Sequence, residues 1–119
     1  MTRSRIVRIG VNPPEAETGT PSCVLSGSPT TRTLNYYTDP GQQFFSGIWE
    51  STPGKWAVDY VEEEFCALVR GKVILTDADG HAETFEEGDA FIIPAGFKGS
   101  WETVEPVRKL YVIYEPKRG

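Results

Sequence analysis

The chain has 119 residues, of which 39% are hydrophobic and 24% are charged, a balance typical of one globular domain rather than a disordered chain. Its 12 glycines and 9 prolines favour turns and short strands and exclude coiled coils and collagen-like repeats. The net charge is −5, and residues 50–105 hold 13 acids against 4 bases, so this stretch lacks the basic face that a nucleic-acid partner requires.

The sequence also bears on compartment and redox state. No apolar run approaches the roughly 18 residues of a membrane span, and the first residues lead into no hydrophobic signal segment. Cys23 and Cys66 are too few for a disulfide framework or a cysteine zinc site, and both are expected to be reduced thiols. We therefore expect a cytoplasmic protein without a membrane partner.

Residues 1–35 are predicted to form an irregular N-terminal arm. A short strand is expected at residues 5–9, and the prolines that follow argue against a helix or a central strand, because proline lacks a backbone donor and fixes φ. A long segment without regular structure is uncommon in a compact domain. The arm is therefore expected either to wrap the body or to reach a second subunit.

Residues 36–119 are predicted to form an all-β body. Short β-favouring segments alternate with turn signals such as Asp79-Gly80, a pattern typical of a sandwich or barrel. Residues 65–69 and 107–114 are apolar on both faces, which predicts strands covered on both sides. The strands are expected at residues 44–50, 56–61, 64–70, 72–76, 82–85, 90–93, 99–104 and 107–114.

Two spacings in the body carry a family resemblance. Glu64 is followed after six residues by Gly71, and Gly88 is followed after five residues by Pro94 in Pro94-Ala95-Gly96. These spacings resemble the two halves of the cupin motif. Residues 44–115 are similar to the small single-domain cupins grouped with the ethanolamine-utilization cupin and the (S)-ureidoglycine aminohydrolase cupins. The resemblance implies a single-domain cupin, a double-stranded antiparallel β-helix or jelly-roll barrel.

The resemblance also implies where a metal ion would bind. The metal-ligand positions of the motif fall on Val58, Tyr60, Glu64 and Gly99. Valine and glycine offer no donor atom, tyrosine is a poor ligand at its usual pKa of about 10, and one carboxylate does not hold a transition metal. The single histidine, His81, falls in the Asp79-Gly80 turn. The sequence therefore predicts no metal and no other cofactor.

Strand alternation predicts what fills the barrel mouth instead. Side chains two residues apart share a face, so Trp101 shares the inward face implied for position 99, and Cys66 shares the face of Glu64. An aromatic cavity with a few polar groups is typical of a small-molecule site. The predicted pocket consists of Tyr60, Glu64, Cys66, Phe97, Lys98 and Trp101.

Roles follow from the chemistry of these side chains. Glu64 is the candidate general acid or base, with Tyr60 and Lys98 as candidate catalytic partners that orient the substrate. The alternatives are a Glu64 that only stabilises the barrel and a Lys98 that is solvated. Trp101 is a candidate for stacking on a planar ligand. Cys66 is expected to be a small buried hydrophobe, because no histidine stands near it to activate the thiol.

Three functions remain open at this point. The first is a metal-independent small-molecule pocket, in an enzyme of small nitrogen-compound metabolism. The second is a non-enzymatic metabolite-binding or scaffolding cupin, and the third is a metal-dependent aminohydrolase or isomerase. The apolar outer faces and the arm predict a homodimer in each case.

Overall fold

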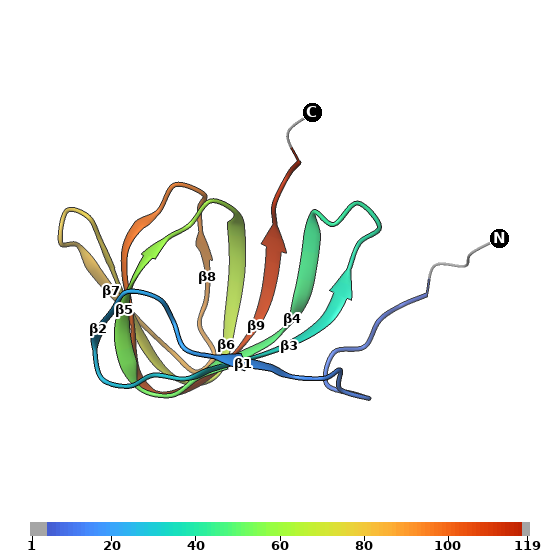
Figure 1. Ribbon diagram of the computed structural model, residues 1–119, viewed down its shortest axis with the longest axis horizontal. Helices are drawn as coiled ribbons and strands as arrows, with labels where there is room; N and C mark the ends of the chain where they lie inside the picture. The colour runs from blue at the N-terminus through green and yellow to red at the C-terminus, as the bar shows by residue number, and fades with distance from the viewer. Residues whose placement is uncertain (1–4, 118–119) are drawn as a thin grey trace.

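The computed structural model describes residues 5–117, which form nine β-strands (Figure 1). No part of residues 5–117 forms a helix long and apolar enough to cross a membrane. The strands are β1 (Glu17–Gly19), β2 (Val24–Ser26), β3 (Thr31–Thr38), β4 (Phe44–Ser51), β5 (Gly54–Asp59), β6 (Glu63–Asp77), β7 (Ala82–Glu86), β8 (Ala90–Ile93) and β9 (Lys98–Tyr114).

The two long strands, β6 and β9, organise the sheet. They pair antiparallel along most of their length, and each contributes to two halves of the fold. The first half of β6 lies between β8 and the end of β9, which continues through β4 and β3 to β1. The second half of β6 lies between β7 and the start of β9, which continues through β5 to β2. The curled sheet closes into the expected all-β jelly-roll barrel (Figure 1).

The bend between the two halves lies at Gly71. This glycine has a φ of +97°, and a Cβ atom there would lie 2.7 Å from the Cα atom of Val107. The β6–β9 register shifts around this point. The sequence predicted separate strands at residues 64–70 and 72–76, and again at residues 99–104 and 107–114. Both predictions are wrong, because each pair of predicted strands is one bent strand with a bulge.

The N-terminal arm contains more regular structure than the sequence predicted. Residues 5–9 do not form the expected strand. Instead β1 and β2 add short strands to two edges of the sheet, where the neighbouring prolines do not interrupt a ladder. The predicted boundary after residue 35 falls inside β3, whose inward positions include Thr33 and Asn35. These polar inward residues hid the alternation that identifies a strand.

The core lies between the two halves of the sheet. It consists of Trp56, Cys66, Leu68, Val73, Leu75, Ile93, Trp101 and Val107. Polar groups within it are paired: the indole N–H of Trp101 donates to the hydroxyl of Thr103 at 2.9 Å, and this hydroxyl lies 2.9 Å from that of Ser51. The core therefore joins β5, β6, β8 and β9, and Trp56 and Trp101 extend from it to the wall of a cavity.

The bend generates a prediction for stability. Gly71→Ala is expected to lower the free energy of unfolding by about 2–4 kcal/mol, because it combines backbone strain with a clash against the Pro106–Val107 backbone. Gly80→Ala is the matched control: φ is +85° there, but no atom lies within 4 Å of the added Cβ. It should cost about 1 kcal/mol. Equal losses in urea denaturation of the two variants would contradict the packing argument.

Candidate functional site

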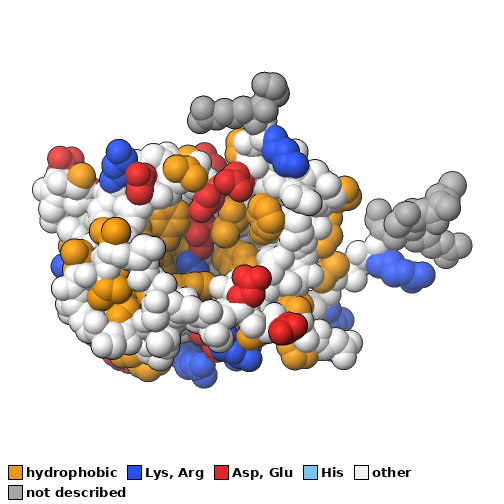
Figure 2. Space-filling model, viewed as in Figure 1, with side chains coloured by type: hydrophobic (Ala, Val, Ile, Leu, Met, Phe, Trp, Pro, Cys, Tyr) orange, Lys and Arg blue, Asp and Glu red, His pale blue; other side chains and the backbone are white. Residues whose placement is uncertain are grey.

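The barrel holds an open cavity of about 510 Å³. Figure 2 shows a hollow on this face of the molecule, with hydrophobic and acidic side chains along its walls. The lining comes from six strands, β1, β3, β4, β5, β6 and β9, and from the loop that follows β5. The cavity therefore depends on the complete barrel, including a strand of the N-terminal arm.

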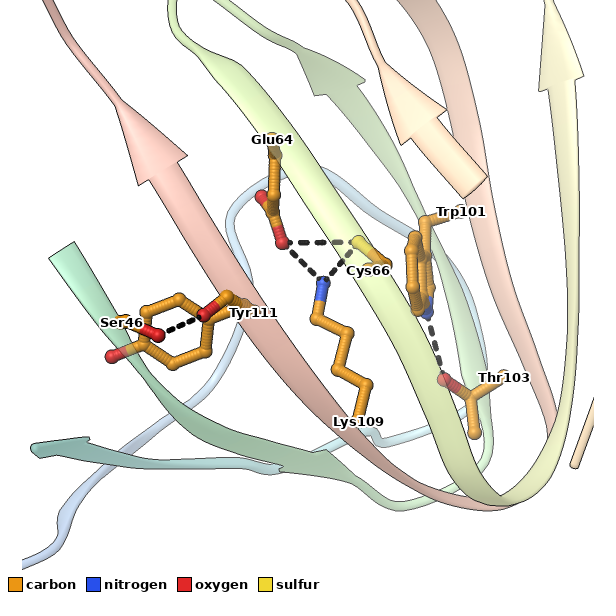
Figure 3. Close-up of polar contacts among 7 residues, drawn as sticks. All are labelled: Ser46, Glu64, Cys66, Trp101, Thr103, Lys109 and Tyr111. Atoms are coloured by element: carbon orange, nitrogen blue, oxygen red, sulfur yellow. Dashed lines mark hydrogen bonds and ion pairs between the residues drawn. The ribbon is translucent and has the colours of Figure 1, made fainter. Parts of the chain in front are cut away.

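The floor of the cavity is a buried ion pair between β6 and β9. The ammonium of Lys109 donates to Oε2 of Glu64 at 2.6 Å, and the two side chains are only 4% and 7% exposed (Figure 3). The Cys66 thiol donates to the same carboxylate oxygen at 3.3 Å, and the ammonium lies 3.5 Å from the Cys66 sulfur. One carboxylate, one ammonium and one thiol thus form a compact polar cluster.

Two tryptophans surround the ammonium. Nζ of Lys109 lies 4.6 Å from the ring centroid of Trp49 and 4.5 Å from that of Trp101, so both indoles make cation–π contacts. Burial lowers the pKa of Lys109, but Glu64 together with Cys66 and Tyr60 outweighs burial and raises the pKa above its ordinary value. Lys109 is therefore expected to be positively charged.

Aromatic side chains also form the cavity walls, and two of them, Tyr60 and Tyr111, carry phenol groups. Burial raises the pKa of Tyr60 well above its usual range. Burial, followed by the carboxylates of Glu64 and Glu17, raises the pKa of Tyr111 to about 12. The Tyr111 hydroxyl donates to Oδ1 of Asn35 at 2.6 Å. Both phenols are hydrogen-bond donors at neutral pH rather than bases.

The structure brings together some of the predicted site residues and separates others. Tyr60, Glu64 and Trp101 line the cavity, and Cys66 lies beside Glu64 as a fully buried thiol. Burial raises the pKa of this thiol to about 12, which suits the expected inert side chain.

Two residues of the predicted pocket, Phe97 and Lys98, do not line the cavity. Phe97 packs edge-on against Tyr60 at 6.3 Å between ring centroids but lines a different hollow. Lys98 is exposed at the start of β9 and does not line the cavity. Gly99 adds no space to the cavity, because a Cβ atom there would collide with the backbone of Thr76 on β6.

The sequence analysis missed Lys109, Trp49 and Tyr111 as lining residues. A signal for Lys109 was present: in the predicted strand at residues 107–114 it is the one charge on the face of Val107 and Tyr111, whereas Arg108 lies on the other face. A charge inside a buried face requires a counter-charge, and Glu64 is the carboxylate on the inward face of the neighbouring strand. The pairing of β6 with β9, which brings these two side chains together, cannot be predicted from the local sequence pattern.

The lining does not fit the metal ion that the cupin resemblance implies. Val58 and Gly99 offer no side-chain donor, and the ammonium of Lys109 lies against the carboxylate of Glu64. Among residues 5–117, no three His, Cys, Asp or Glu side chains come close enough to hold a metal. A metal would have to displace a covalently tethered cation and find further ligands.

Comparisons with known proteins place this geometry in a family. The model of the EutQ-like cupin domain matches residues 38–111. A Pseudomonas syringae protein of the DUF861 family, of unknown function, is 27% identical with a TM-score of 0.73 over 86% of this chain, which spans only 43% of that protein. Comparison with curated proteins gives no match.

Two further solved structures are similar. A DUF861 family protein from Thermotoga maritima is 38% identical over 54% of this chain and 73% of its own, with a TM-score of 0.53. The EutQ protein of Clostridium difficile is 20% identical, covers 74% of this chain and 70% of its own, and has a TM-score of 0.66. The second likeness concerns the fold alone. The cupin fold expected from the sequence is confirmed.

The buried ion pair generates a prediction for a double-mutant cycle. Lys109→Met and Glu64→Gln are each expected to lower the free energy of unfolding by about 3–5 kcal/mol, because each leaves a buried group without its partner. The double variant should lose less than the sum, with a coupling of roughly 2 kcal/mol or more. Urea denaturation measures all three.

A surface pair provides the matched control for this cycle. Lys72 and Glu86 lie 3.8 Å apart and their side chains are 35% and 65% exposed. Lys72→Met is expected to cost less than about 1 kcal/mol. Strictly additive losses for Lys109→Met and Glu64→Gln would show that the buried pair does not stabilise the barrel as a unit.

The two thiols generate a second prediction. Cys23 is exposed, whereas Cys66 is buried with its pKa raised to about 12. At pH 8 a thiol reagent should modify one equivalent in the native protein and two in denaturant. Cys23→Ser should reduce the native value to none. Rapid native labelling of Cys66 in that variant would mean that the cavity floor opens readily.

Proposed function

The chain belongs to the EutQ-like cupin domain family, and we propose that it binds a small protonated organic amine in its cavity without a metal ion. The observation that carries the proposal is the unused oxygen of Glu64. Both contacts of its carboxylate, to Lys109 and to Cys66, use Oε2. Oε1 has no protein partner among residues 5–117 and is not a buried unsatisfied atom, so it is accessible from the cavity.

The charge around the cavity favours a cation. Lys109 is neutralised by Glu64, and Glu17 adds a second carboxylate to the lining without an ion-pair partner within residues 5–117. Next to Glu64, burial and then the carboxylates of Glu115 and Glu64 raise the pKa of Glu62, a sign of negative potential at this end of the barrel. A protonated amine would relieve this excess of negative charge.

The walls favour the same class of ligand. Trp56, Tyr60 and Phe45 present ring surfaces to the cavity, and aromatic faces attract organic ammonium groups. Thr33, Asn35 and Thr38 of β3 also line the cavity. The amide of Asn35 already bonds to Tyr111 and Thr38, so the hydroxyl groups of Thr33 and Thr38 are the groups offered to a polar substituent such as an alcohol. A volume of about 510 Å³ suits a small metabolite. The likeness to EutQ, a cupin of ethanolamine utilization, makes ethanolamine the first probe.

Binding is better supported than covalent catalysis. The two phenols and the Cys66 thiol have raised pKa values and stay protonated at neutral pH, and Lys109 stays charged. None of them is an activated nucleophile. The metal-dependent alternative requires ligands that the lining does not supply. The carboxylates of Glu64 and Glu17 are the acidic groups that line the cavity, so any turnover is expected to depend on them.

The proposal is tested by thermal shift and calorimetry with matched small molecules. Ethanolamine and longer amino alcohols should raise the melting temperature and release heat on binding, whereas ethylene glycol and acetate at equal concentration should not. Prior treatment with a chelator should leave binding unchanged. A preference for acetate, or binding that requires added metal, would contradict the proposal.

Variants locate the binding to this cavity. Glu17→Gln removes an exposed carboxylate without touching the core and is expected to weaken amine binding about threefold to tenfold, the effect of losing one exposed charge partner. Glu64→Gln should abolish binding, provided that calorimetry is done below its own melting temperature. Glu87→Gln, an equally small change at an exposed turn outside the cavity, should bind as the wild type does.

A further inference from the structure

A row of polar and charged residues crosses the sheet outside the cavity. The strand register places these residues opposite one another on neighbouring strands: Thr18 of β1, Arg32 of β3, Glu50 of β4, Arg108 of β9 and Arg70 of β6. Residues directly opposite on neighbouring strands share a face of the sheet. These residues are here called the arginine row, because three guanidinium groups in it surround a single carboxylate.

Glu50 is the common partner of the three arginines. Oε1 of its carboxylate lies 3.1 Å from Nη1 of Arg32. Oε2 lies 3.4 Å from Nη2 of Arg70 and 3.8 Å from Nε of Arg108. One carboxylate balances only one of the three positive charges. The arginine row therefore keeps an excess of two positive charges, in a chain whose net charge is −5.

Two members of the row repel each other. Arg70 and Arg108 lie directly opposite in the β6–β9 ladder, and like charges in this position destabilise a sheet. Solvent screens part of the repulsion, because their side chains are 59% and 36% exposed. Within residues 5–117 both guanidinium groups depend on the same oxygen of Glu50 for their ion pairs. A second anion bound beside Glu50 would relieve the remaining repulsion.

A hollow of about 290 Å³ lies beside the row. Four members of the row, Thr18, Arg32, Glu50 and Arg70, line it, and Glu50 is the one acidic residue among its described lining. A guanidinium presents several N–H donors in a planar fork. Within residues 5–117, Arg32 and Arg70 each make one side-chain hydrogen bond, in both cases to Glu50. Their other donors are therefore available to a ligand in the hollow.

We propose that the arginine row binds the phosphate group of a small molecule in this hollow. A phosphate dianion matches the excess of two positive charges, and its oxygens accept the paired N–H groups that arginine forks donate. The hydroxyl of Thr18 adds an uncharged donor at the end of the row. The hollow is close to the ~300 Å³ at which ligand pockets begin, which suits inorganic phosphate or a small phosphate monoester.

The first test is calorimetric titration at pH 8 and constant ionic strength, where phosphate groups are dianions because their second pKa is about 6. The probes are inorganic phosphate and phenyl phosphate, a monoester. At least one of them should bind about tenfold or more tightly than acetate, which carries a single charge. A preference for phenyl phosphate would assign the site to a monoester, and no such preference would assign it to the phosphate group itself. If neither probe binds better than acetate, the proposal is overturned.

Matched arginine variants locate the binding. Arg70→Gln removes a largely exposed side chain and should weaken phosphate binding about tenfold, because it removes a charged donor from the hollow. Arg8→Gln is the control, because Arg8 is exposed but does not line the hollow, and it should bind phosphate as the wild type does. Equal weakening in the two variants would mean diffuse attraction by net charge and would overturn the site.

Glu50→Gln separates an anion site from a cluster that only pairs its own charges. In the proposed site Glu50 competes with the ligand for the same guanidinium groups, so its replacement should tighten phosphate binding about threefold. In a purely structural cluster the change would alter the melting temperature alone. Unchanged or weaker phosphate binding by a variant that still melts cooperatively would overturn the proposal. Arg70→Gln should bind ethanolamine as the wild type does, which keeps this test separate from that of the cavity.

Discussion

The ion pair between Glu64 and Lys109 is the constraint around which the open end of the barrel is organised. A buried ammonium or carboxylate alone would cost several kcal/mol, so each residue requires the other. Their 2.6 Å contact joins β6 to β9 on the inward face, and the indoles of Trp49 and Trp101 close over the ammonium. Both hydrogen bonds to the Glu64 carboxylate use Oε2, so Oε1 is left for a ligand. The same pair of side chains thus bears on both the stability of the barrel and the proposed binding.

The tethered ammonium lies against the one carboxylate that the cupin motif would offer to a metal ion. A metal in such a barrel offers open coordination positions and exchanges with solvent. The ammonium of Lys109 supplies a positive charge from β9 itself, but its hydrogen atoms are directed to Glu64 and Cys66 and its surface is covered by aromatic rings. It therefore stabilises the carboxylate without polarising a ligand. What remains for a ligand is Oε1 of Glu64, the phenol groups and the aromatic walls.

Local pattern was sufficient for much of this arrangement. The inward face that the cupin resemblance implies, extended by the period of two residues, placed Glu64, Cys66 and Trp101 inward, and the turn chemistry of Asp79-Gly80 placed the β6–β7 hairpin. The missing parts depend on pairing between distant strands. Lys109 acquires its role only because β9 lies beside β6, 45 residues away along the chain. Likewise, the local sequence predicts a strand break at Gly71, but this residue lies within one continuous strand, β6, where the register with β9 shifts.

The long strands β6 and β9 link the two faces of the sheet. Their inward residues, Glu64 and Lys109, form the cavity floor, while their outward residues include Phe65 and Leu110, which are 42% and 38% exposed. A strand that is apolar outside and charged inside inverts the usual pattern of a half-buried sheet. The β6–β9 ladder therefore carries the ion pair on one face and partly exposed apolar side chains on the other. A substitution that disturbs the pairing of these two strands is expected to disturb the cavity floor as well, because the ion pair joins the same strands.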